Sequence, residues 1–134
     1  MKRYLSSLVV LSVVCLLATQ GMGADLYVRS GATGKGTMDA PYGDLWKAVD
    51  RAVRGDIIHV AAGTYPENVT VDKDLTILGA DANTTIIDGG GGGYTFCIYH
   101  SVVDVSNLGV TGATGEFASD CKGYTTHGAG IYSM

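Results

Sequence analysis

Short apolar runs recur through most of the chain, and the gaps between them are too short to hold helices. From Asp56 onward, segments of about three to six residues rich in Val, Ile, Leu and Thr alternate with Gly, Asp and Asn. Runs of this length and composition are typical of β-strands. We therefore predict strands in the segments DIIHV, ENVTV, LTILG, TTIID, YTFCIY, VVDV and LGVTG.

Two stretches of this region resemble each other. LTILGADANTTIIDG (residues 75–89) and VDVSNLGVTG (residues 103–112) both read apolar-polar-apolar, then a Gly or Asn break, then apolar again. Equivalent apolar positions recur after roughly 20 to 28 residues, the spacing of stacked coils rather than of hairpin strands. The pattern predicts a solenoid.

Five consecutive glycines, Gly89–Gly93, stand between two predicted strands. A loop that cradles a phosphate depends on the N-terminus of a following helix to present aligned N–H groups. Here a strand follows instead. We interpret the glycines as a corner whose backbone needs positive φ angles.

One segment has the pattern of an amphipathic helix, residues 44–54. At 100° per residue its apolar side chains cover one arc, and its charged side chains fill the other side. Asp44 or Gly43 is suited to cap the start and Gly55 to end the helix. The predicted apolar arc is Leu45, Trp46, Ala48, Val49, Ala52 and Val53.

The segment from Met1 to Gly23 has the order of a secretory signal peptide. Lys2 and Arg3 are followed by an apolar run over residues 5–18 and by small residues at 21–24. This run is shorter than the roughly 20 apolar residues of a membrane anchor. We predict cleavage after Gly23 or Ala24, a mature chain of residues 24–134, and a secreted, periplasmic or cell-surface location with no membrane attachment. The net charge of −4 excludes a nucleic-acid partner on electrostatic grounds.

Removal of the signal peptide would take Cys15 with it and leave Cys97 and Cys121. An even pair in an exported protein favours a disulfide. The two residues are 24 positions apart, about one predicted coil, so they could lie on neighbouring coils. Two free thiols are the alternative.

The mature chain resembles the N-terminal end of secreted right-handed parallel β-helix proteins, the pectate-lyase-like superfamily. The resemblance rests on an opening LYV strand, on APYGDLWKAVDRAVRGD as a helix before the first coil, and on IIHVAAGTYPENVTV with its GTY turn. LTILGADANTTIIDG would be the second coil, and GAGIYSM (residues 128–134) the start of another coil strand.

The resemblance implies an all-β fold: a right-handed parallel β-helix of two to three coils, capped by the N-terminal helix with its apolar side on the first coil. Stacked coils bury a continuous core. The side chains expected to point inward are Ile58, Val60, Val69, Val71, Leu75, Ile77, Ile86, Val103, Val105, Leu108 and Val110.

The resemblance predicts no catalytic, cofactor or metal residue in these 134 positions. Lyases of this superfamily bind calcium through Asp clusters, with an Arg or Lys as base, in later coils. No position here matches them, so calcium is expected only in further coils. Asp72 and Asp74 are interpreted as a solvated turn. His59, His100 and His127 lack metal-ligand spacing and are interpreted as surface residues.

Three aromatic residues are candidates for stacking against sugar rings: Tyr94, Tyr99 and Tyr124. The alternative is that they fill the core or turns. The chain ends directly after a strand-like segment, which suggests a truncated reading frame or a fragment whose later coils are missing.

Two functions remain open. The first is the N-terminal segment of a polysaccharide-lyase-like protein, not catalytic by itself, that binds polysaccharide. The second is an adhesive surface scaffold. A small secreted all-β protein of another topology is a third reading. If the full protein is an enzyme, the resemblance implies a carbohydrate-active lyase or hydrolase.

Overall fold

The computed structural model describes residues 22–91, 93–113 and 131–133. These residues form ten strands and one short helix, and the strands pair in three sheets in which every pair is parallel. The first sheet contains β1 (Asp25–Val28), β2 (Ile57–Val60), β5 (Leu75–Gly79) and β8 (Val103–Ser106). The second contains β3 (Gly63–Pro66), β6 (Thr85–Asp88) and β9 (Gly109–Thr111), and the third contains β4 (Val69–Val71), β7 (Phe96–Ile98) and β10 (Ile131–Ser133).

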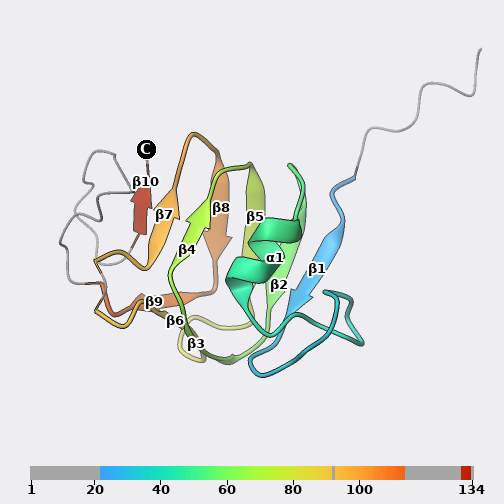
Figure 1. The fold of residues 1–134 in the computed structure, drawn as a ribbon, viewed down its shortest axis with the longest axis horizontal. Helices are drawn as coiled ribbons and strands as arrows, with labels where there is room; N and C mark the ends of the chain where they lie inside the picture. Colours follow the sequence, from blue (N-terminus) through green and yellow to red (C-terminus); the bar gives the residue numbers. More distant parts are fainter. Residues whose placement is uncertain (1–21, 92, 114–130, 134) are drawn as a thin grey trace, which may run out of the picture.

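From β2 to β9 the chain visits the three sheets in turn, placing one strand in each before returning to the first (Figure 1). Each returning strand lies beside the one laid down before it. Ile57 on β2 pairs with Thr76 on β5, and Thr76 pairs in turn with Asp104 on β8. The predicted recurrence of strand positions is therefore confirmed for these residues.

The seven predicted strand runs correspond to β2 and to β4–β9. One segment was misinterpreted. GTY, expected as a turn, lies in β3 and pairs in register with β6. The terminal GAGIYSM segment contains β10, which pairs with β7 as expected for another strand of the stack.

The core forms where equivalent side chains of paired strands meet. Ile58 and Ile77 are paired in the first sheet and are fully buried. In the third sheet Val69 pairs with Phe96, and both are fully buried as well. Because parallel strands in register bring equivalent positions together, each strand extends the apolar row of its neighbour. Val103, Val105, Leu108 and Val110 are partly buried and pack against this core.

One core residue was predicted wrongly. Ile86 is only partly buried, whereas Ile87 is fully buried and pairs with the buried Tyr65. Side chains alternate between the two faces of a strand, so only one of the two isoleucines can face inward. Tyr65 fixes which one, and a one-residue slip would exchange them.

Helix α1 (Leu45–Arg51) covers the end of the stack where β1 and β2 lie, and it packs against β4, β1 and β2 (Figure 1). It is shorter than predicted. Ala52 has an extended backbone, and the carboxylate of Asp56 accepts the N–H of Val53 at 2.8 Å. This contact draws the chain away from the helix axis.

Two residues of the predicted apolar arc are exposed. Leu45, Ala48, Val49 and Ala52 are buried, but Trp46 is 48% exposed and Val53 is 64% exposed. Val53 lies beyond the helix end. Because α1 is short, only the narrow stripe that contacts the strands is buried, and Trp46 falls at its margin.

Asp44 precedes α1 as predicted, but its side chain makes no capping hydrogen bond. The cap comes from elsewhere in the sequence. The N–H groups of Leu45 and Trp46 donate to the two carboxylate oxygens of Glu67 at 2.9 and 2.7 Å. Glu67 thus satisfies two of the unpaired donors at the helix start.

The glycine run forms a corner between β6 and β7, as predicted. Gly90, Gly91 and Gly93 have φ angles of 63°, 80° and 93°, a region that other residues rarely adopt. The side chain of Asp88 accepts the N–H of Gly90 at 2.9 Å, which fixes the start of the turn. Within residues 22–113 and 131–133, as far as they are described, no helix is long and apolar enough to cross a membrane.

Candidate functional site

A groove of about 410 Å³ lies between α1 and β4. One side is the helix and the other is the outward face of the strand, so its shape depends on how α1 packs against β4. We call it the α1–β4 groove. Its lining residues are Trp46, Val49, Asp50, Asn68, Thr70, Asp72 and Lys73.

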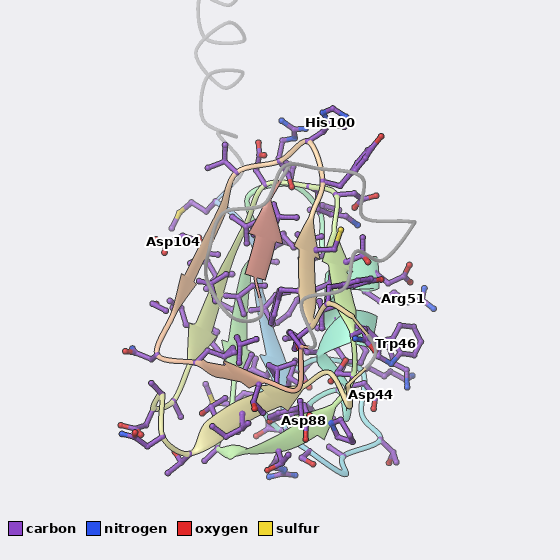
Figure 2. All side chains as sticks on the ribbon, turned by 90° about the vertical axis from the view of Figure 1, so that its left-hand side faces the viewer. Asp44, Trp46, Arg51, Asp88, His100 and Asp104 are labelled. Atoms are coloured by element: carbon purple, nitrogen blue, oxygen red, sulfur yellow. The ribbon has the colours of Figure 1, made fainter. Side chains whose placement is uncertain are left out.

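Trp46 is the most exposed aromatic side chain of this groove. Figure 2 shows it projecting outward from the ribbon, on the same side of the molecule as Arg51. The ammonium group of Lys47 lies 5.4 Å from the centre of its ring, within the range of a cation–π contact. An amphipathic ring with half its surface open offers a flat platform for a ligand. Sequence reasoning missed this role because Trp46 had been assigned to the buried arc.

Hydrogen-bonding groups line the strand side of the groove. The side-chain amide of Asn68 donates to the main-chain oxygen of Tyr94, and it lies 3.5 Å from the carbonyl oxygen of Gly89. The hydroxyl groups of Thr70 and Tyr94 are 3.4 Å apart. Tyr94, a predicted stacking residue, therefore lies next to the polar wall of the α1–β4 groove.

The charged groups of the groove are not arranged as an acid–base pair. The ammonium group of Lys73 donates to the carbonyl oxygens of Val49 and Ala52 at 3.2 and 3.3 Å, and lies 3.7 Å from a carboxylate oxygen of Asp72. The side chains of Asp50 and Asp72 are 66% and 67% exposed. Both carboxylates are well solvated, and Lys73 is engaged with the end of the helix. The arrangement can bind and orient a ligand.

The other predicted site residues lie elsewhere. Tyr99 follows β7, and its ring meets the ring of His100 edge-on at 4.3 Å between centroids. It does not line the groove. Tyr124 lies outside the described residues, and so does His127.

Cys97 is buried in β7 and is disulfide-bonded. Cys121 lies outside the described residues, so its pairing with Cys97 stays a prediction. The residue beside Cys97 on β10 is Tyr132. The strand register of the third sheet therefore does not test the predicted disulfide between Cys97 and Cys121.

A second groove, of about 490 Å³, lies on the outer face of the first sheet. Here the ring of His59 stacks on Tyr27 at 4.9 Å, and its Nε2 atom is 2.8 Å from a carboxylate oxygen of Asp25. The sequence indicated that His59 points outward, but gave no sign of these partners. None of the residues that line this groove is Ser, Thr or Cys.

Asp72 and Asp74, on either side of Lys73 in the sequence, have different surroundings. Asp74 pairs with Arg54 at 2.8 Å and accepts the N–H of Val102 at 2.8 Å, whereas Asp72 is exposed beside Lys73. Among the described residues, no group of three or more His, Cys, Asp or Glu side chains could hold a metal ion.

The comparisons with known proteins return no match. No protein-family model matches the chain, and neither a curated protein nor a solved structure does. The resemblance to pectate-lyase-like proteins therefore stays a prediction.

Proposed function

We propose that this chain is the N-terminal part of an exported right-handed parallel β-helix protein, and that its α1–β4 groove binds a neutral polysaccharide without transforming it. The observation that carries the binding proposal is the half-exposed Trp46 ring above a wall of amide and hydroxyl groups.

Two features support the β-helix. The strands from β2 to β9 enter three parallel sheets in turn, which is the order that stacked three-sided coils require. A connection between parallel strands of one sheet is almost always right-handed, because right-twisted strands pack back on the sheet only that way. Export is supported by the charged, apolar and small-residue order of residues 1–24.

The groove suits a sugar for chemical reasons. A sugar ring has apolar C–H faces and an equator of hydroxyl groups, so it needs a flat apolar surface and hydrogen-bonding partners at its rim. Trp46 supplies the first, and Asn68 and Thr70 supply the second. Ligand sites generally combine an apolar surface with a few oriented polar groups in this way.

The charges of the groove favour a neutral ligand. Asp50 and Asp72 are exposed carboxylates at its rim. The ammonium group of Lys73, which also lines the groove, already donates to the carbonyl oxygens of Val49 and Ala52 and lies beside the carboxylate of Asp72. A polyuronate would meet like charges, which repel it most strongly at low salt. A neutral glycan avoids this cost.

Tryptophan fluorescence tests the proposal directly, since the chain contains a single tryptophan. Titration of the exported chain with neutral oligosaccharides, such as those of glucan, mannan and xylan, should change the emission of Trp46 for at least one of them. Polygalacturonate should bind more weakly. Absence of any response to neutral glycans, together with tight binding of polygalacturonate, would overturn the choice of ligand.

Replacement of Trp46 with Ala should weaken binding about tenfold or more. Burying roughly 60 Å² of ring against a sugar is worth about 1.5 kcal/mol at 25 cal/mol per Å². Because the variant lacks tryptophan fluorescence, its affinity is measured by calorimetry. Tyr99→Ala is the matched control, since Tyr99 is also exposed but lies outside the groove. Equal losses in both variants would argue against the site. An adhesive scaffold would bind through other surfaces and leave W46A unaffected.

A further inference from the structure

Asp56 is a buried carboxylate that meets the chain at the predicted end of the signal peptide. The residue is 3% exposed. One carboxylate oxygen accepts the N–H of Val53 at 2.8 Å, and the other accepts the N–H of Ala24 at 2.7 Å. The carboxylate is therefore bound by two backbone amides, one of which belongs to a residue next to the predicted cleavage point.

The neighbouring basic side chains are engaged elsewhere. Arg54, two residues before Asp56, pairs with Asp74 at 2.8 Å. His59, three residues after it, pairs with Asp25 at 2.8 Å. Among the described residues, no ion pair joins Asp56 to a Lys, Arg or His side chain. Burying a carboxylate without a neighbouring cation costs free energy of folding. A positive charge beside Asp56 would therefore stabilise the folded chain.

The chain around Ala24 is fixed tightly against the same turn. Its carbonyl oxygen accepts the N–H of Ile57 at 3.0 Å. A Cβ atom on Gly23 would lie 1.7 Å from the carbonyl oxygen of Gly55. The backbone of residues 23–24 therefore lies on the backbone of residues 55–57, with no room for a side chain on Gly23.

The sequence independently favours cleavage of one bond here. Signal peptidases require small residues at the last and third-last positions of the leader. Cleavage after Gly23 puts Gly21 and Gly23 at those positions, whereas cleavage after Ala24 would put Met22 at one of them.

We infer that a signal peptidase hydrolyses the Gly23–Ala24 bond and that the α-ammonium group so created binds the buried carboxylate of Asp56. Water adds across the peptide bond, the new carboxylate leaves with Gly23, and the amide nitrogen of Ala24 becomes the ammonium. The 2.7 Å hydrogen bond thereby becomes an ion pair. Processing supplies the missing charge and stabilises the mature fold. This inference rests on the proposed export.

The ion pair has a pH signature. An α-amino group titrates near 8 in an unfolded chain, and pairing with Asp56 raises its pKa in the folded chain. Its contribution to stability is therefore complete below about pH 8 and is lost as pH rises through the higher folded pKa. The surrounding Asp25–His59 and Arg54–Asp74 pairs are common to every chain compared below.

The test begins with the exported product of the full chain. N-terminal sequencing and intact mass should show a first residue of Ala24. A chain begun at Gly23 is the matched control, because its ammonium is displaced by one residue while the Ala24 N–H still reaches Asp56. Between about pH 7 and 10, the urea midpoint of the Ala24 chain should fall relative to that of the Gly23 chain. Each unit by which the pKa is raised corresponds to about a tenfold change in the ratio of folded to unfolded protein.

Replacement of Asp56 with Asn in the Ala24 chain should remove that pH step. If this variant does not fold, the comparison of the two chain starts still decides the matter. An exported protein that begins at another residue, or equal pH profiles for the two starts, overturns the inference and leaves the proposed export intact. A chain that keeps its leader and stays inside the cell overturns both.

Discussion

Glu67 and Lys73 lie on either side of strand β4 and contact the two ends of helix α1. The carboxylate of Glu67 accepts the first two N–H groups of the helix, and the ammonium group of Lys73 donates to the carbonyl oxygens of its last turn. Negative charge at the start and positive charge at the end both complement the helix dipole. A helix of seven residues is too short to be stable alone, so its position depends on these two side chains and on its buried stripe.

We expect the stability contributed by Glu67 to decrease as pH rises. Burial raises the pKa of Glu67, with Asp44 acting in the same direction, and the backbone hydrogen bonds from Trp46 and Leu45 only partly oppose this. A raised pKa in the folded chain means that folding takes up protons. The stabilisation is therefore complete below the ordinary value of about 4.3 and is lost as pH rises through the folded pKa.

The Glu67→Gln variant tests this sign. Urea unfolding from pH 3.5 to 7 should show the stability of the wild type falling relative to that of the variant as pH rises. A difference that changes in the opposite direction would show that the helix N–H groups, rather than burial, dominate. Glu67→Ala, which removes both acceptors, should cost about 1–2 kcal/mol at the acidic end of this range and less as pH rises.

Replacement of Lys73 with Met should destabilise the fold by about 0.5–1 kcal/mol. The variant keeps the apolar stem of the side chain but loses the charge at the helix end. Thermal unfolding at low and high salt separates the effect of the charge from that of the apolar stem. The difference in stability between wild type and variant should shrink as salt screens the charge. A difference that is unchanged by salt would contradict a charge effect.

Replacement of Tyr65 with Phe should cost about 1–3 kcal/mol. The buried hydroxyl donates to the carbonyl oxygen of Ala61 at 2.7 Å and accepts the N–H of Ser30 at 3.3 Å, so its removal leaves buried partners without a hydrogen bond. Burial also raises the pKa of Tyr65. The stability of the wild type should therefore fall above about pH 10, and Y65F should lack that component. Equal alkaline profiles would show that Tyr65 is not the group responsible.

Ile77 on β5 and Ile86 on β6 test the register of the core. Ile77→Ala should cost about 2–5 kcal/mol because Ile77 is fully buried beside Ile58. Ile86→Ala should cost much less, since Ile86 is only partly buried. Chemical denaturation of both variants gives the comparison. A loss for I86A as large as that for I77A would contradict the register in which Ile87 faces Tyr65.

The disulfide can be examined by counting thiols. If Cys97 pairs with Cys121, and if the proposed signal peptide is removed together with Cys15, the exported chain unfolded without reductant should contain no free thiol. Reduction should then lower stability by about 3 kcal/mol, the usual effect of opening a loop of this size. Two thiols before reduction would contradict the pairing.

Local patterns of the sequence predicted most of the strands, because the runs are short and rich in apolar residues and are separated by residues such as Gly, Asp, Asn and Ser. They also predicted the corner at Gly89–Gly93. They did not resolve Ile86 from Ile87, since both fit an alternating strand and only the pairing with Tyr65 chooses between them. The helix length depended on Asp56, which lies beyond the segment whose periodicity was read.

The candidate site was less accessible to such reasoning. Trp46 fits an apolar arc as well as Leu45 does, and its exposure follows only from the way α1 docks on β4. Glu67 is 22 residues from Leu45, and no local pattern links a residue after a Tyr-Pro pair to a helix start so far away. Contacts of this kind depend on how the helix and the strands pack in three dimensions.

The hydrogen bond from the N–H of Trp46 to Glu67 links the α1–β4 groove to the protonation state of Glu67. This hydrogen bond lowers the pKa of Glu67, against the larger effect of burial, so any ligand that strengthened the bond would favour the ionised carboxylate. By thermodynamic reciprocity, such a ligand would make Glu67 a stronger acid, and acidification would weaken the binding of that ligand by the same factor. The helix cap would then act as a pH-dependent control on what the groove retains.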